Sequence, residues 1–180
     1  MSAGTPGGVR ALLRGNILWL SVASFLNDAS SEMIFPLLPL FLVGTLGAGP
    51  AFLGIIEGVA ETTASFLKLA GGWISDRLGR RRALVAGGYG IAAATRPLMA
   101  LATLPWHVLV IRFTDRIGKG IRTAPRDALL AESADSTLRG RAFGIHRAAD
   151  HAGAVIGPLL AAGIRLLAPG NIRLVFLLAA

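Results

Sequence analysis

Apolar residues form long runs along this chain, and no stretch alternates between apolar and polar residues with period two. Because a bilayer core of about 30 Å needs roughly 20 helical residues, five runs are long enough to cross it. A sixth run begins at Asn171 and stops at the last residue, Ala180. Open sheet edges are not stable in lipid, so the runs predict an all-α membrane protein. The five complete runs are Asn16–Thr45, Ala51–Ile74, Ala83–Thr103, Trp106–Leu130 and Phe143–Leu167.

The same pattern predicts two regions. Residues 1–15 are mostly polar, carry Arg10 and Arg14, and are expected to form an N-terminal tail. The apolar run that follows is too long for the core of a secretory signal, so we expect it to be a retained first helix. Residues 16–180 would form one transmembrane domain. Ten residues cannot complete a sixth crossing, so we expect a fragment of a longer protein, truncated within its sixth helix.

Composition agrees with lipid-facing helices. Hydrophobic residues make up 53% of the chain, and its 23 glycines come on top of that share. The net charge of +8 could suggest a nucleic-acid partner, but the arginines lie in short connections or inside apolar runs and form no basic soluble face. We therefore exclude nucleic acid. Cysteine is absent, so there is no disulfide framework or thiolate metal site, and we predict no cofactor and no metal.

Loop arginines predict the orientation, because cytoplasmic connections are enriched in positive charge. With the N-terminus inside, eight arginines fall on the cytoplasmic side and two on the outer side. We therefore expect a multi-pass protein of the cell membrane with a cytoplasmic N-terminus. The inner set is Arg10, Arg14, Arg77, Arg80, Arg81, Arg82, Arg139 and Arg141, and the outer set is Arg165 and Arg173.

Ionisable residues within the predicted spans are expensive in lipid and therefore need a partner, water or a ligand. The fourth run has the most, and at 100° per residue its five bases fall within an arc of about 120°. They outnumber the acids of that run, which favours a wet cavity or an anionic guest, although a structural ladder of ion pairs is the alternative. The residues are Arg112, Asp115, Arg116, Lys119, Arg122, Arg126 and Asp127.

Acids in the first two runs could neutralise those bases. Asp28 and Glu32 are four residues apart and share one helix face, next to Asn27. A carboxyl group whose neighbours change during a conformational cycle can bind and release a proton, so either acid could couple transport to protons. Glu57 and Glu61 of the second run fit a structural role better.

Other polar and helix-breaking residues have simpler interpretations. His146, Arg147, Asp150 and His151 fit hydrogen bonding at the cytoplasmic end of the fifth run better than a metal site, and the partner of Arg96 cannot be named. One proline pair and one glycine pair remain. Pro36 and Pro39 should bend the first helix, and Gly153 and Gly157, followed by Pro158, would let another helix approach closely or would form a hinge.

The turn between the second and third runs resembles the loop signature of the major facilitator superfamily of secondary transporters, G-x-x-x-D-R-x-G-R-R. Every position of that signature is matched, on the predicted cytoplasmic side. A simple positive hairpin would explain the arginines but not the acid and both glycines. The matching residues are Gly72, Asp76, Arg77, Gly79, Arg80 and Arg81.

Two weaker resemblances follow. The fourth run is similar to R-x-x-Q-G-x-G, with Arg112 and Gly118 matching, while Asp115 and Arg116 replace the glutamine and the first glycine. The fifth run is similar to the antiporter signature G-x8-G-x3-G-P-x2-G-G. Gly144, Gly153, Gly157 and Pro158 match it, and Ala161 and Ala162 replace the last pair.

The resemblance implies the N-terminal six-helix half of a twelve-helix transporter, whose partners are the bilayer, a small-molecule substrate and the missing C-terminal half. Helices one and four would line the central cavity. The loop signature would be a gating latch: Asp76 would contact the missing half, and Arg77 and Arg80 would bind acids or lipid phosphates. The residues that this places on the substrate and proton path are Asn27, Asp28, Glu32, Arg112, Asp115, Arg116 and Lys119.

The sequence thus predicts alternating-access transport coupled to H+, and the antiporter signature favours export of drugs or metabolites. Two alternatives stay open: transport of an anion on the arginine-rich fourth helix, and a membrane scaffold or sensor that does not transport. An ATP-driven pump is not expected, because no phosphate-binding G-x-x-x-x-G-K-[ST] loop is present. An enzyme is not expected either, because no catalytic motif appears.

Overall fold

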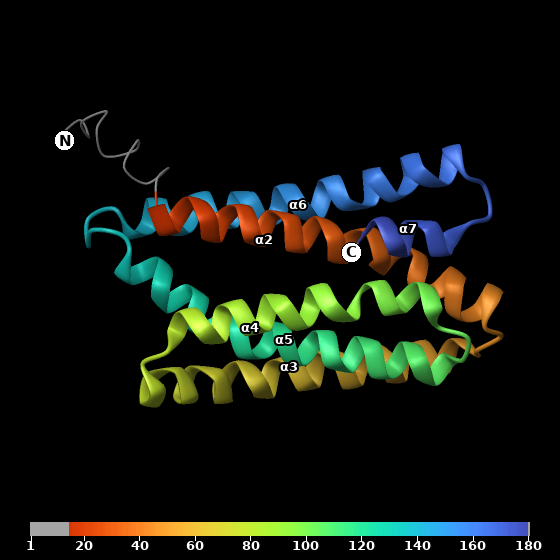
Figure 1. Ribbon diagram of the computed structural model, residues 1–180, viewed down its shortest axis with the longest axis horizontal. Coiled ribbons are helices and arrows are strands. Elements are labelled where there is room, and N and C mark those ends of the chain that lie inside the picture. Colours follow the sequence, from red (N-terminus) through yellow and green to blue (C-terminus); the bar gives the residue numbers. More distant parts are fainter. Residues whose placement is uncertain (1–14, 180) are drawn as a thin grey trace.

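The computed structural model describes residues 15–179, and these residues are almost entirely helical, with no strand among them. The predicted N-terminal tail, residues 1–15, therefore lies outside the described residues except for Gly15. The helices, labelled as in Figure 1, are α2 (Gly15–Ile34), α3 (Pro50–Leu78), α4 (Arg81–Thr95), α5 (Pro105–Glu132), α6 (Arg139–Leu167) and α7 (Ile172–Leu178). The all-α prediction is confirmed.

Two of the predicted runs are each divided. The first continues from α2 into a 3-10 turn, Phe35–Leu37, and a π-helical segment, Leu40–Thr45. Proline has no N–H and cannot donate a hydrogen bond within the helix. This explains why the regular α-helix ends just before Pro36 and Pro39. Likewise, α4 passes at Pro97 into a 3-10 segment, Pro97–Leu101. Both changes lie near the same end of the bundle.

The fifth helix also differs from its predicted start. We expected it to begin at Phe143, but α6 begins at Arg139. Arg139 and Arg141 therefore lie in the first turn of a helix and not in a loop. The α3–α4 turn is similarly short: α3 extends to Leu78, and its C-cap Gly79 has a φ of 61°, a left-handed conformation that glycine adopts without steric penalty.

The helices pack as two groups. In Figure 1, α2 lies along α6, and α3 and α4 lie along α5. The α3–α4 turn and the α5–α6 connection lie at one end of the bundle, together with the start of α2. The α2–α3, α4–α5 and α6–α7 connections lie at the opposite end. There α7 packs against the Pro97–Leu101 segment.

Glycine makes these pairings close. A Cβ built on Gly153 of α6 would lie 2.4 Å from the Phe25 carbonyl oxygen, and one on Gly157 would lie 2.4 Å from that of Ala29. In the other group, a Cβ on Gly118 of α5 would lie 2.6 Å from the Gly88 carbonyl oxygen of α4. Small residues at such positions let two backbones approach. Gly144, the first glycine of the antiporter-like pattern, differs, because nothing lies within 4 Å of its Cβ position.

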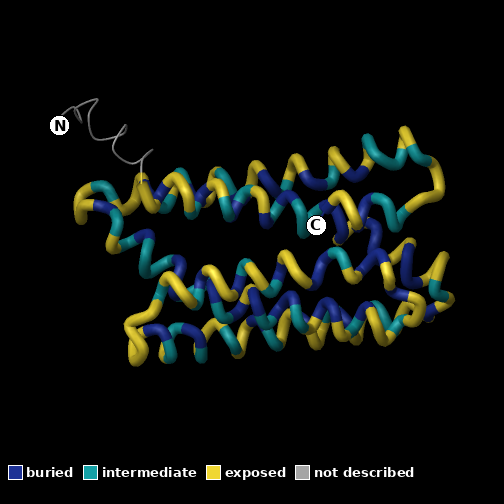
Figure 2. Tube along the Cα trace, viewed as in Figure 1, coloured by how far each residue is buried: buried dark blue, intermediate teal, exposed yellow. Residues whose placement is uncertain are grey.

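The bundle has an apolar outside. Large side chains such as Phe66, Leu69 and Leu167 are 71%, 76% and 89% exposed. Figure 2 shows buried positions on the faces that helices turn toward one another and exposed positions on the outer faces. The buried hydrophobic residues form two clusters, a large one that includes Phe41 and Phe176 and a small one around Ile17 and Leu130.

By length and composition alone, two segments of the described chain qualify as membrane spans: Arg81–Leu101 and Arg139–Leu167. We expected five complete spans. The helices α2, α3 and α5 fall short because each contains polar and ionised residues. The positions of those polar side chains therefore decide how these three helices can be accommodated.

Replacing Gly153 with alanine tests the α2–α6 contact. The added Cβ would force α6 away from α2, and overpacking of this kind costs about 1–3 kcal/mol, so we expect a lower melting temperature in detergent. Gly144→Ala is the matched control on the same helix. It should have no effect or a slightly stabilising one, because its site is open. Equal melting temperatures for the two variants would contradict the close packing.

Candidate functional site

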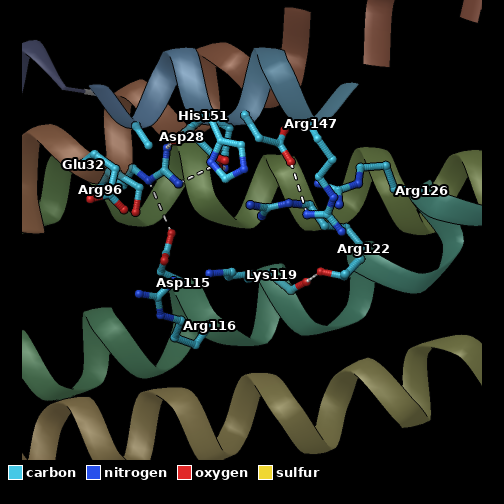
Figure 3. Close-up of a pocket in the computed structure, with 15 residues that line it drawn as sticks. Asp28, Glu32, Arg96, Asp115, Arg116, Lys119, Arg122, Arg126, Arg147 and His151 are labelled. Carbon is cyan, nitrogen blue, oxygen red and sulfur yellow. Dashed lines mark hydrogen bonds and ion pairs between the residues drawn. The ribbon is translucent and has the colours of Figure 1, made fainter. Parts of the chain in front are cut away.

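A polar cavity of about 210 Å³ lies between the two helix groups. Figure 3 shows its side chains reaching inward from α2 and α6 on one side and from α5 and the end of α4 on the other. Its lining is mostly charged, in contrast to the outer surface. The lining residues are Asn27, Asp28, Ser31, Glu32, Arg96, Asp115, Arg116, Lys119, Arg122, Thr123, Arg126, Arg147, Asp150, His151 and Ala154.

Arg96, at the end of α4, holds three helices together. Its Nε lies 3.3 Å from Asp115 Oδ1 of α5. Its Nη1 donates to the Asn27 carbonyl oxygen at 2.9 Å and to Ser30 Oγ at 2.7 Å, and its Nη2 donates to Asn27 Oδ1 at 2.8 Å. Arg96 and Asp115 are only 6% and 5% exposed. This cluster joins α2 of one group to α4 and α5 of the other.

Two further arginines of α5 pair with α3. Arg112 donates to both carboxylate oxygens of Glu57, with Nη2 at 2.8 Å from Oε1 and 3.0 Å from Oε2. Arg116 Nε lies 3.3 Å from Glu61 Oε1. A bidentate arginine–carboxylate pair fixes direction as well as distance. These pairs place α3 against α5, and they occupy both glutamates.

The other ion pairs around the cavity lie toward the α5–α6 connection. Arg126 donates to Asp127 Oδ1 at 3.0 Å and to Ser24 Oγ of α2 at 3.2 Å. On α6, Arg147 Nη1 lies 3.6 Å from Asp150 Oδ2, and His146 Nε2 lies 3.6 Å from Asp150 Oδ1. Among residues 15–179 there is no cluster of three or more acidic or histidine side chains arranged to hold a metal ion.

Apart from His151, which is counted as neutral at pH 7, four ionisable side chains of the cavity have no ion-pair partner within the described part of the chain. They are Asp28 and Glu32 of α2 and Lys119 and Arg122 of α5, and we call them the four unpaired charges. Asp28 accepts a hydrogen bond from Asn27 Nδ2 at 3.0 Å. Arg122 donates to the Gly88 carbonyl oxygen at 3.2 Å, and its guanidinium lies 4.5 Å from the centre of the Tyr89 ring.

The cavity brings together six of the seven residues that the sequence places on the substrate and proton path. The exception is Arg112, which is 3% exposed, pairs with Glu57 and does not line the cavity. The cavity also holds residues that sequence reasoning did not place there: Arg96, Arg147, Asp150 and His151. Arg122 and Arg126, which the sequence put on the charged face of the fourth run but not on the substrate path, line it as well.

The α6 residues in that set carried a detectable signal. Gly153 and Gly157 mark the face of α6 that touches α2, and Asp150 lies one turn before Gly153. A polar residue in phase with a glycine contact face must lie at the helix interface. The cytoplasmic-end interpretation of Arg147, Asp150 and His151 missed this relation, because it used position along the helix and not direction around it.

The α3–α4 turn forms a second polar cluster at one end of the bundle. Arg81 lies 3.0 Å from Asp76, also contacts Glu132 at the end of α5, and thereby connects three helices. Arg77 stacks its guanidinium 4.5 Å from the Trp73 ring. Of the six signature residues, Gly72, Asp76 and Arg77 lie within α3, and Gly79 and Arg80 form the turn itself.

The apolar outer surface and the charged interior are typical of a helical membrane protein with a polar cavity. The chain matches the model of the Major Facilitator Superfamily over residues 20–180, and it belongs to this family. The resemblance seen in the sequence is therefore confirmed. The prediction of a membrane protein from a transporter family is confirmed as well.

Several relatives share the matched region. An uncharacterized MFS-type transporter of Methanocaldococcus jannaschii is 40% identical over 148 residues, which is 82% of this chain and 37% of that protein. An uncharacterized protein of Mycobacterium tuberculosis is 38% identical over 68% of this chain and 30% of its own length. The multidrug resistance protein MdtH of Cronobacter sakazakii is 34% identical over 71% of this chain and 32% of its length. The chain thus spans about a third of each relative.

Removing Arg96 tests the three-helix cluster. Arg96→Met leaves Asp115 buried without its cation, and breaking a buried pair in this way costs about 3–5 kcal/mol, so we expect a large fall in melting temperature. The double variant Arg96→Met, Asp115→Leu removes both charges and should recover part of the loss. Arg141→Gln, an exposed arginine of α6, is the control. If Arg96→Met melts no lower than Arg141→Gln, the cluster is not structural.

Proposed function

We propose that this chain forms the N-terminal half of a secondary active transporter that moves small solutes by alternating access and couples this movement to protons. The second half would close the cavity from the side that the two helix groups leave open. We refer to that assembled twelve-helix protein as the complete transporter. The single observation that carries the proposal is the charged cavity inside a bundle whose outer surface is apolar.

Asp28 and Glu32 are the proposed proton carriers. They lie one helical turn apart on α2, line the cavity and have no ion-pair partner among residues 15–179. A carboxylate already held by an arginine keeps its charge and takes up a proton with difficulty, which argues against Asp115, Glu57 and Glu61. An unpaired carboxylate in a cavity is free to exchange a proton for a bound solute.

Export is the direction that we favour. The support comes from the antiporter-like glycine pattern on α6 and from relatives named as multidrug resistance proteins. The alternative that rests on surplus arginines has less support, because Arg112, Arg116 and Arg126 each pair with an acid. The cell membrane is the proposed location, with the α3–α4 turn in the cytoplasm.

The proposed roles of the signature residues follow from the same geometry. Asp76 is held by Arg81 at the α3–α4 turn, where a helix end of the second half would compete for it. Gly157 and Pro158 lie where α6 presses on α2, so a bend there would change the width of the cavity. The latch and the hinge are both proposals about motion.

Single cysteines test the orientation, because the chain has none of its own. Arg82→Cys at the α3–α4 turn should react with a membrane-impermeant maleimide only after cells are permeabilised. Thr103→Cys, an exposed position at the other end of the bundle, should react in intact cells. Both variants are made in a complete transporter without other cysteines. The reverse labelling pattern would mean that the N-terminus faces outward.

Asp28→Asn and Glu32→Gln test proton coupling. In proteoliposomes loaded with a pH-sensitive dye, the unaltered complete transporter should move protons when ethidium or members of an amino-acid panel are added. The variants should lose at least about nine tenths of that proton movement, since an amide side chain can neither bind nor release a proton. Asp135→Asn, in the α5–α6 connection, is the control and should behave normally. Normal proton movement in both α2 variants would exclude these carboxylates as carriers.

A further inference from the structure

The ion pairs of the cavity determine which charges are available to a solute. Most of the bases on α5 are neutralised by acids of the same chain, so the basic appearance of α5 overstates the charge that a solute would meet. What remains is the set of four unpaired charges defined above, two acidic and two basic. Among the described residues, the charge available to a solute is therefore balanced and not positive.

The two signs come from different helices. Asp28 and Glu32 lie four residues apart on α2, and Lys119 and Arg122 lie three apart on α5, so each pair shares one helix face. Figure 3 shows the α2 acids on the upper side of the pocket and Lys119 and Arg122 on the α5 side. The cavity thus has an acidic wall and a basic wall.

The basic wall combines one fixed and one adaptable group. Arg122 is 4% exposed and is held by the Gly88 carbonyl oxygen and the Tyr89 ring, so its position is set before a solute arrives. Lys119 is exposed and has no ion-pair partner among the described residues, and the nearby Glu61 is occupied by Arg116. A planar, preorganised guanidinium beside a flexible ammonium suits a carboxylate.

The balance of charges discriminates between classes of solute. A simple anion would satisfy the basic wall but leave the acidic wall unpaired, and a simple cation would do the reverse. Partly buried charges are stable only when they are paired or hydrated. A molecule with one positive and one negative group satisfies both walls together.

We propose that the cavity binds a small zwitterionic solute, with its ammonium group at Asp28 and Glu32 and its carboxylate at Lys119 and Arg122. This inference rests on the proposed function, because it names the class of solute that the transporter carries.

Binding to the purified complete transporter in detergent, without any gradient, tests the inference separately from transport. The probes are glycine, 4-aminobutyrate and 6-aminohexanoate, which place the two charges at increasing distances, and hexanoate and hexylamine, which each keep one charge. We expect one of the three amino acids to bind at least about tenfold more tightly than either single-charge analogue. Equal or tighter binding of hexanoate or hexylamine would overturn the proposal, as would failure of all three amino acids to bind.

Charge-removing variants then assign the two walls. Lys119→Gln should weaken binding of the preferred amino acid at least about tenfold and leave hexylamine binding unchanged. Glu32→Gln should weaken amino-acid binding by a similar factor and leave hexanoate binding unchanged. The controls are Lys68→Gln, which alters the other of the chain's two lysines, and Asp135→Asn. The proposal fails if the controls weaken binding as much as the cavity variants do.

The outcomes separate this inference from the proposed function. A complete transporter that binds the amino acid but moves no protons or solute across proteoliposomes would contradict proton-coupled transport and support the zwitterion site. A transporter that moves ethidium with protons but binds none of the amino acids would support coupled transport and overturn the zwitterion site.

Discussion

Charge compensation inside an apolar bundle is the constraint on which this structure depends. A lipid-facing surface cannot solvate ionised groups, so the charges of α5 must either pair within the bundle or face its polar cavity. Glu57 and Glu61 do this from α3. Arg96, placed by α4, pairs with Asp115 and also holds α2 through Asn27. The same pairs that neutralise the charges therefore set the positions of three helices around α5.

The contacts within each helix group differ in kind from the contacts between the two groups. Within each helix group, glycines bring backbones close: Gly153 and Gly157 between α6 and α2, and Gly88 and Gly118 between α4 and α5. Between the groups, polar contacts such as that of Arg126 with Ser24 accompany the apolar clusters at either end. The cavity occupies the middle of that boundary, so a relative movement of the groups would change the cavity most.

The sequence predicted the helical class and the family, because long apolar runs and a complete turn signature are local features. It placed the ends of helices less well, since the continuation of α6 back to Arg139 depends on contacts that no local pattern shows. It placed Asp28 and Lys119 on the substrate path, and both line the cavity. It also placed Arg112 there, although Arg112 does not line the cavity, because a helical wheel shows that a base faces inward but not which acid it pairs with. The partners of Arg96 come from residues 19 to 69 positions away, and local reasoning could not reach them.

The central claim is that water reaches the charged faces of α2 and α5 while lipid covers the outside, and spin-label accessibility measures this most directly. Single labels at Lys119 and at Leu69 would be placed in the reconstituted complete transporter. The account predicts that the label at position 119 is quenched by a water-soluble nickel complex and the label at position 69 by oxygen dissolved in lipid. A position 119 inaccessible to the nickel complex, or a position 69 more accessible to nickel than to oxygen, would contradict it.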